Sequence, residues 1–136
     1  MDRREVILEN YKNPFHKGLI DDNNFVHSNT NNESCIDEVN LMVKIENNKI
    51  VDAYFDGEAC AICTSSSSIM LKEIIGKDID EIKEIYDNVI DMVDGKSYNE
   101  KILNDINVYN DTKNQPNRKM CVLLPWYAVK KIIDKN

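Results

Sequence analysis

The 136-residue chain predicts an α+β domain, in which a small antiparallel β-sheet of about three strands is covered by helices. Between residues 39 and 55, two runs of alternating apolar and polar residues flank an Asn-Asn pair, which is typical of a β-hairpin. From residue 69 onward, apolar residues recur three and four positions apart, which indicates helices. We expect residues 1–136 to form a single domain, because one core usually takes roughly 100 to 200 residues.

The first half of the chain predicts one helix and the sheet. Residues 3–11 carry apolar side chains at helical spacing, and this helix is expected to end before Pro14, because the residue before proline disfavours helical backbone. A short strand is expected around residues 25–28. The hairpin turn falls on Asn47 and Asn48, since Asn tolerates positive φ. The apolar residues of its strands are Val39, Leu41, Val43, Ile45, Ile50, Val51, Ala53 and Phe55.

The second half predicts three helices. Two of them are expected to end at Gly76 and Gly95, which suit the positive φ of a helix C-terminus. The serine run 65–68 opens the first of these helices, and we expect its hydroxyls to cap the N-terminus and its small side chains to allow close packing on the sheet. A polar connection with short helical turns spans residues 97–117, and the last helix covers about residues 118–133.

The composition argues against two classes of partner and indicates the cellular compartment. The net charge is −7 and no basic block interrupts it, which argues against a nucleic acid or an anionic membrane surface as partner. The chain shows no apolar signal segment, and no run approaches the roughly 18 apolar residues of a membrane span. We therefore expect a cytoplasmic protein. In that reducing compartment the four cysteines stay as thiols, so metal binding, catalysis and simple burial remain open.

Three cysteines and one aspartate are expected to converge. Cys35 and Asp37 enter a strand two residues apart, so their side chains share one face. Cys60 lies where the second hairpin strand meets the serine-rich helix, and the helix dipole there favours a thiolate. Cys121 lies near the start of the last helix, and we expect the dipole of that helix to favour its thiolate in the same way. Thiolates with one carboxylate in a tetrahedral array suit zinc or iron.

The pair Cys60 and Cys63 forms the only C-x-x-C in the sequence. One interpretation is a redox pair, although the βαβ context of thioredoxin-like motifs is missing. A second is half of a metal site, although no matching C-x-x-C exists to complete it. The third is two small buried residues, because free cysteine is often a core residue. The residues alone leave these three interpretations open.

Four ordered segments resemble the SufU branch of the IscU/NifU-type iron–sulfur assembly proteins. The segments are "ENYKNPFHKGLI", "SCIDEVNLMVKI", "FDGEACAICTSSSSIM" and "NRKMCVLLPW". They are similar, in order, to the family's N-terminal segment, its Cys-Gly-Asp strand, its Gly-x-Gly-Cys motif and its Arg-x-x-Cys helix. The stretch 95–117 is similar to the insertion that separates the SufU branch from IscU scaffolds. The resemblance covers nearly the whole chain.

The resemblance implies a site and a reaction. Cys35, Asp37, Cys60 and Cys121 fall on the four metal-ligand positions of the family. In the SufU branch the metal is zinc, and the protein accepts persulfide sulfur from a pyridoxal-phosphate cysteine desulfurase of the SufS type. By position, Cys35 is the sulfur acceptor, which passes sulfur to a downstream iron–sulfur scaffold or to apo-proteins. In the IscU branch the same positions hold a transient [2Fe–2S] cluster.

The sequence departs from the family pattern at four positions. Ile36 and Ala59 replace glycines beside the ligands, and isoleucine resists backbone angles that glycine adopts. Met120 stands where SufU proteins usually have lysine, and the adjacent Lys119 is a candidate substitute. Cys63 stands where the family has a small residue, and we expect it to be a bystander.

The sequence thus predicts a zinc-binding sulfur-transfer protein of iron–sulfur assembly, without independent catalytic turnover. One alternative is a scaffold that assembles a [2Fe–2S] cluster or holds iron itself. Another is a degenerate interaction domain without metal, in which the cysteines only pack. His16 and His27 are interpreted as surface residues, with His27 the only one able to approach the cysteines.

Overall fold

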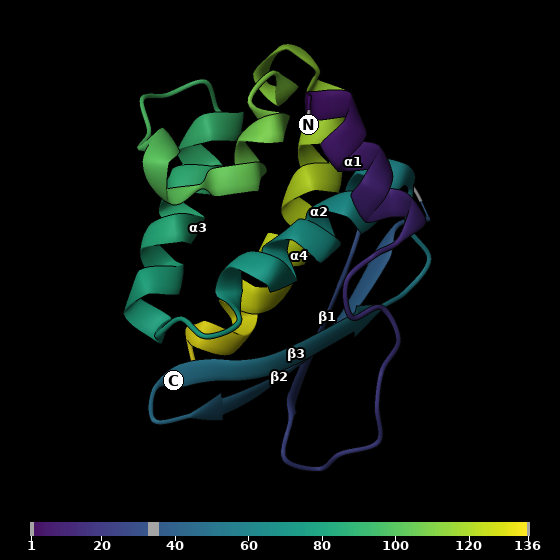
Figure 1. Ribbon diagram of the computed structural model, residues 1–136, viewed down its shortest axis with the longest axis vertical. Coiled ribbons are helices and arrows are strands. Elements are labelled where there is room, and N and C mark those ends of the chain that lie inside the picture. Colours follow the sequence, from purple (N-terminus) through teal and green to yellow (C-terminus); the bar gives the residue numbers. More distant parts are fainter. Residues whose placement is uncertain (1, 33–35, 136) are drawn as a thin grey trace.

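The computed structural model describes residues 2–32 and 36–135, so Cys35 lies outside the described residues. It shows a three-stranded antiparallel sheet in the order β1-β2-β3, with helices over one face (Figure 1), which confirms the predicted α+β class. The strands are β1 (Val26–Asn31), β2 (Glu38–Glu46) and β3 (Lys49–Asp56). The helices are α1 (Arg3–Lys12), α2 (Ala61–Ile74), α3 (Ile79–Val93), α4 (Pro116–Ile133) and the short 3-10 helices η1 (Glu100–Ile102), η2 (Asn104–Tyr109) and η3 (Thr112–Asn114).

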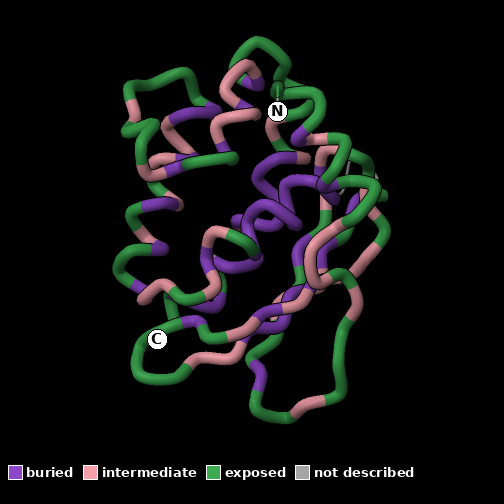
Figure 2. Tube along the Cα trace, viewed as in Figure 1, coloured by how far each residue is buried: buried purple, intermediate pink, exposed green. Residues whose placement is uncertain are grey.

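The hairpin between β2 and β3 forms as the sequence predicts. Asn47 and Asn48 have φ angles of 52° and 63°, so both turn residues adopt the left-handed conformation that a tight hairpin turn requires. The ladder pairs Leu41 with Phe55 and Val43 with Ala53. These four residues belong to the main core. Figure 2 shows that buried residues occur both in the sheet and in the helices.

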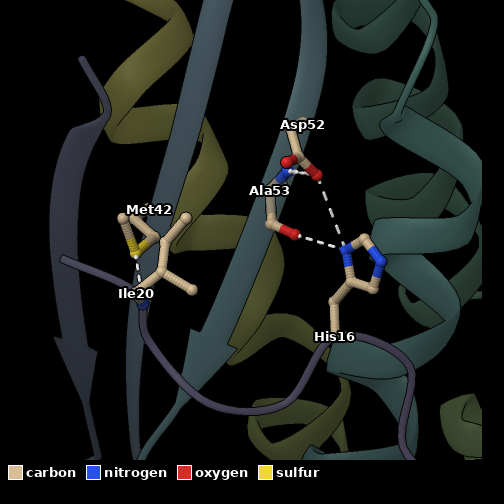
Figure 3. Close-up of polar contacts among 5 residues, drawn as sticks. All are labelled: His16, Ile20, Met42, Asp52 and Ala53. Carbon is tan, nitrogen blue, oxygen red and sulfur yellow. Dashed lines mark hydrogen bonds and ion pairs between the residues drawn. The ribbon is translucent and has the colours of Figure 1, made fainter. Parts of the chain in front are cut away.

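The opposite face of the sheet is also covered, which the alternating pattern did not predict. Met42 points to this face and is nonetheless fully buried. The segment 14–25 crosses it, where the backbone N–H of Ile20 donates to Met42 Sδ at 3.4 Å (Figure 3). In the same segment, His16 Nδ1 lies 2.9 Å from the carbonyl oxygen of Ala53 and its ring stacks on Tyr54. His16 is therefore half-buried, and the prediction of a surface histidine is wrong for it.

Helix α2 lies at the centre of the helical layer and packs against α1 and α4 (Figure 1). The serines at 65–68 are all buried, and their hydroxyls do not cap the helix, so that prediction is wrong. The cap is Cys60, whose Sγ accepts the N–H of Cys63 at 3.4 Å. The hydroxyl of Ser66 instead donates to the carbonyl of Val122 at 2.7 Å, and that of Ser68 to Asn10 Oδ1 at 2.7 Å. The serines thus tie α2 to α4 and α1.

The two predicted helix-ending glycines both have positive φ, but they act differently. After α3, the N–H of Gly95 bonds the carbonyl of Met92 and that of Lys96 bonds Asp91, the paired pattern of a Schellman cap. After α2, the N–H of Gly76 instead donates to the carbonyl of Ile50 at 2.7 Å. Gly76 therefore fixes the end of α2 to the start of β3.

Helix α4 begins at Pro116, slightly earlier than the sequence suggests, and continues through Pro125. Its carbonyls at Leu124 and Ala128 accept hydrogen bonds from Thr30 and Ser28 of β1, at 2.9 and 2.7 Å. These bonds fix α4 beside the sheet. In the described ranges, 2–32 and 36–135, we find no helix with the length and apolar character needed to cross a bilayer.

Candidate metal centre

Asp37, Cys60 and Cys121 come together at one end of the sheet. One ligand atom from each lies within 4.8 Å of the other two. Asp37 immediately precedes β2, Cys60 caps α2 and Cys121 belongs to α4. Three elements distant in sequence thus bring two sulfurs and a carboxylate to one point, as the sequence predicts for three of its four candidate ligands.

The carboxylate of Asp37 organises this cluster. The side chain is buried, with 3% of its surface exposed. Its Oδ1 accepts the backbone N–H of Cys60 at 2.8 Å, and its Oδ2 accepts the thiol of Cys121 at 3.4 Å. A buried carboxylate is tolerated where such bonds replace its hydration. Asp37 therefore links the start of α2 to α4 while its oxygens stay beside both sulfurs.

A close backbone contact holds Asp37 near Cys60. The N–H of Glu38 donates to the carbonyl of Glu58 at 2.7 Å. Gly57 makes this approach possible, because a Cβ at Gly57 would lie well inside van der Waals contact with the carbonyl oxygen of Glu38. Its φ of 132° is also one that other residues rarely adopt. Glycine at this position thus supports the site from outside it.

The surroundings of Cys121 disfavour a negative charge on its sulfur in the absence of a cation. Burial, the neighbouring Cys60 and the carboxylate of Asp37 together raise the pKa of the Cys121 thiol to about 12. The expected thiolate at Cys121 is thus not favoured in the metal-free protein. Helix α4 begins at Pro116, so Cys121 lies beyond its first turn, where the dipole has little effect.

This donor set fits a thiophilic divalent cation. Two thiol sulfurs and a carboxylate oxygen are ligand types that zinc and iron accept. A cation would also remove the repulsion that keeps Cys121 protonated, because a nearby positive charge favours both thiolates. A hollow lined by Asp37, Cys60, Met120 and Cys121 gives access to the cluster from solvent.

The remaining candidates lie elsewhere. Cys35, the fourth predicted ligand and the predicted sulfur acceptor, lies outside the described residues. Cys63 is fully buried in the core, whereas Cys60 is exposed. His27 is exposed on β1, where it pairs with Met42 at a distance from the Asn31 end of the strand that adjoins Asp37. Among the described residues, the structure therefore does not bring His27 to Cys60 or Cys121.

Two departures from the family pattern are now explained. Ala59 is not one of the non-glycine residues with positive φ, so it replaces glycine there without backbone strain. Lys119 forms an ion pair with Asp94 at the end of α3. Lys119 lies two residues before Cys121 on α4, so the two side chains point in different directions from the helix. The suggestion that Lys119 substitutes for a lysine at position 120 is therefore wrong.

The family model for the NifU-like N-terminal domain matches residues 2–122, which is most of the chain. The protein belongs to the NifU-like family. The family model ends one residue after Cys121 and so includes all four candidate ligands.

Relatives of this NifU-like protein come from both branches of the family. It is 37% identical over 133 residues to the zinc-dependent sulfurtransferase SufU of Bacillus subtilis, covering 97% of this chain and 89% of that one. It is 33% identical to the iron–sulfur cluster assembly scaffold protein IscU of Thermotoga maritima, covering 96% and 92%. The crystal structure of FiSufU from Fervidobacterium islandicum AW-1 superimposes with a TM-score of 0.84 at 36% identity, covering 93% and 92%.

Proposed function

We propose that this protein binds zinc and accepts sulfur from a pyridoxal-phosphate cysteine desulfurase for iron–sulfur cluster assembly in the cytoplasm. The observation that carries the proposal is the cluster of Asp37, Cys60 and Cys121, with ligand atoms within 4.8 Å. The similarity to the B. subtilis relative, a zinc-dependent sulfurtransferase, supports it. A downstream scaffold or apo-protein then takes the sulfur.

Asp37, Cys60 and Cys121 would hold the metal, with Cys35 as the fourth ligand. Covalent geometry keeps the Cα atoms of Cys35 and Asp37 within about 7 Å of each other, since the two are two residues apart. When bound, the metal supplies positive charge that stabilises thiolates near neutral pH. In the metal-free protein, Asp37 holds the Cys60 backbone and the Cys121 thiol beside each other through its two hydrogen bonds.

Cys35 is the proposed acceptor, because Cys60 is the N-cap of α2 and Cys121 lies within α4, so both are held in place by helices. Its thiolate attacks the outer sulfur of the persulfide on the desulfurase cysteine. A new S–S bond forms on Cys35 and the old one breaks, so the desulfurase cysteine leaves as a thiolate. No outside oxidant or reductant is required.

A second candidate is a scaffold that itself assembles a [2Fe–2S] cluster, which the IscU relatives favour. The same donor set accepts iron. Anaerobic purification followed by metal analysis and a visible spectrum separates the two, because a [2Fe–2S] protein contains iron and sulfide and is coloured, whereas a zinc protein is colourless.

The sulfur acceptor is tested by incubating the protein with a cysteine desulfurase and cysteine, then mapping persulfides by mass spectrometry. We expect persulfide on Cys35 and none after Cys35→Ser. Persulfide found mainly on Cys63 would overturn the assignment.

The carboxylate ligand is tested by comparing metal content in Asp37→Ala and Cys63→Ser. We expect Asp37→Ala to lower zinc affinity by tenfold or more, because it removes a ligand and the bonds that position two others. Cys63→Ser is expected to retain zinc, because Cys63 is buried in the core. The reverse result would replace Asp37 by Cys63 in the ligand set and refute the role of Asp37.

A further inference from the structure

We propose that Cys60 and Cys63 form a reversible disulfide when the metal site is empty, so that this chain carries a thiol switch within its metal centre. Cys63 has no part in the proposed sulfur transfer. The inference rests on the arrangement of these two residues at the start of α2.

The two thiols differ in exposure in the way that a stepwise oxidation requires. Cys60 is exposed and meets solvent, whereas Cys63 is buried, with none of its surface exposed. An external disulfide can therefore reach Cys60 first. Cys63 is shielded from such reagents and reacts only with a partner inside the protein.

The backbone already holds the pair close together. Cys60 is the N-cap of α2 and Cys63 is its third residue, and the N–H of Cys63 donates to Cys60 Sγ at 3.4 Å. Ideal helix geometry places Cα atoms three residues apart at about 5 Å. Disulfides span Cα separations of roughly 4.4 to 6.8 Å, so the backbone spacing of the pair is compatible with a disulfide.

Cys121 is the main rival for Cys60, since its Sγ lies within 4.8 Å of that residue. It belongs to α4, however, and its thiol donates to Asp37 Oδ2. A bond from Cys121 to Cys60 would break this hydrogen bond and cross-link α4 to α2, which pack against each other. The bond between Cys60 and Cys63 stays within one helix turn and leaves the contact between Cys121 and Asp37 in place.

The chemistry balances with a low-molecular-weight disulfide as oxidant. The Cys60 thiolate attacks one sulfur of that disulfide, forms a mixed disulfide and releases the first small thiol. The Cys63 thiol then loses its proton and attacks Cys60 Sγ, which closes the protein disulfide and releases the second small thiol. Two protein thiols are oxidised and one small disulfide is reduced.

Oxidation would also disable the metal site. A disulfide sulfur carries no negative charge and is a poor metal ligand, whereas a thiolate is a strong one. With Cys60 oxidised, Asp37 and Cys121 are the only members of the described cluster that remain available. The switch would therefore couple zinc binding to the thiol redox state of the cell.

The test treats metal-free protein with oxidised glutathione, alkylates free thiols and maps tryptic peptides. Cleavage after lysine places Cys60 and Cys63 together in peptide 50–72, whereas Cys35 falls in peptide 18–44 and Cys121 in peptide 120–130. We expect peptide 50–72 to be unalkylated and two hydrogens lighter than the dithiol form. Its disulfide linkage to either other peptide, or a full set of alkylated thiols, would overturn the proposal.

Cys63→Ser is the matched variant, because serine differs from cysteine only in having oxygen in place of sulfur. We expect it to retain a stable glutathione adduct on Cys60, since the resolving thiol is gone. An adduct that persists equally in the wild type would also contradict the proposal. The wild-type peptide map decides the question even if the variant fails to fold, and neither measurement depends on sulfur transfer.

Zinc binding provides the second measurement. Oxidised wild-type protein is expected to lose at least tenfold in zinc affinity and to recover it on reduction. Unchanged affinity in protein shown to carry the Cys60–Cys63 disulfide would refute the switch.

Discussion

Helices α2 and α3 follow one another in the chain, and their N-termini are stabilised in opposite ways. At α3, Asp78 accepts the N–H of Glu81 at 2.8 Å and Glu81 reaches back to the N–H of Asp78, a complete capping box with acidic residues in the first turn. At α2, the cap is the sulfur of Cys60, a weak acceptor, and no acidic residue lies in the first turn. The N-terminus of α2 thus has a thiol that can bind a metal, whereas the N-terminus of α3 has a complete capping box that stabilises the helix.

The two helices also differ in how far their side chains are buried. Helix α3 buries a single apolar stripe and exposes charged residues on its other side. Helix α2 is buried almost throughout, including the serines at 65–68. Ser65, Ser66 and Ser68 bond neighbours on η2, α4 and α1, whereas Ser67 bonds the carbonyl of Cys63 within the helix. A surface helix can therefore be recognised from its own pattern, whereas a central helix depends on its surroundings.

The largest expected effect comes from enlarging a serine of α2. Ser66→Leu is expected to lower the free energy of unfolding by about 3 to 4 kcal/mol, because it overpacks the core and removes the bond to Val122. Glu84→Leu on the exposed side of α3 is the control and should change stability by under about 0.5 kcal/mol. Chemical denaturation of both variants measures the difference. Similar values for the two would show that α2 is not packed as described.

Metal removal is expected to have the second-largest effect. It acts at the N-terminus of α2 and not at that of α3. If zinc binds at Asp37, Cys60 and Cys121, chelation should lower the free energy of unfolding by about 2.7 kcal/mol relative to protein at zinc concentrations of 100 times Kd. Melting curves with and without chelator measure this. An unchanged Tm after zinc has demonstrably been removed would mean that the metal does not stabilise the fold.

Removing the cap of α3 should cost less and leave the metal site intact. Asp78→Ala is expected to lower stability by about 1 kcal/mol, because the first-turn N–H of Glu81 loses its acceptor. Asp80→Ala, which removes an acidic first-turn residue without the cap, is the control. Zinc content should match the wild type in both variants, and a loss of zinc in Asp78→Ala would contradict the independence of the two N-termini.

The smallest effect has the opposite sign. In metal-free protein, Cys60→Ser is expected to raise stability by about 0.5 kcal/mol, since serine is a better N-cap than cysteine. The same change should abolish tight zinc binding. Denaturation of metal-free protein beside zinc titration tests both halves, and a destabilised Cys60→Ser would show that the thiol contributes more to α2 than its cap bond.

The sequence by itself determined the local elements. Alternation and the Asn47–Asn48 pair were enough for the hairpin, and helical spacing with Gly95 was enough for α3, because those signals act between neighbouring residues. The motif pattern also singled out Asp37, Cys60 and Cys121 before any geometry was known.

Only the tertiary structure decided how these residues are held. The burial of Met42 depends on segment 14–25 crossing the sheet, and the serine hydroxyls of α2 find partners on helices far along the chain. The raised pKa of the Cys121 thiol likewise follows from its burial and from Cys60 and Asp37 lying beside it. Hydrogen bonds and charge interactions act over a few ångströms in space, and the partners are often far apart in sequence. A local sequence pattern therefore does not identify those partners.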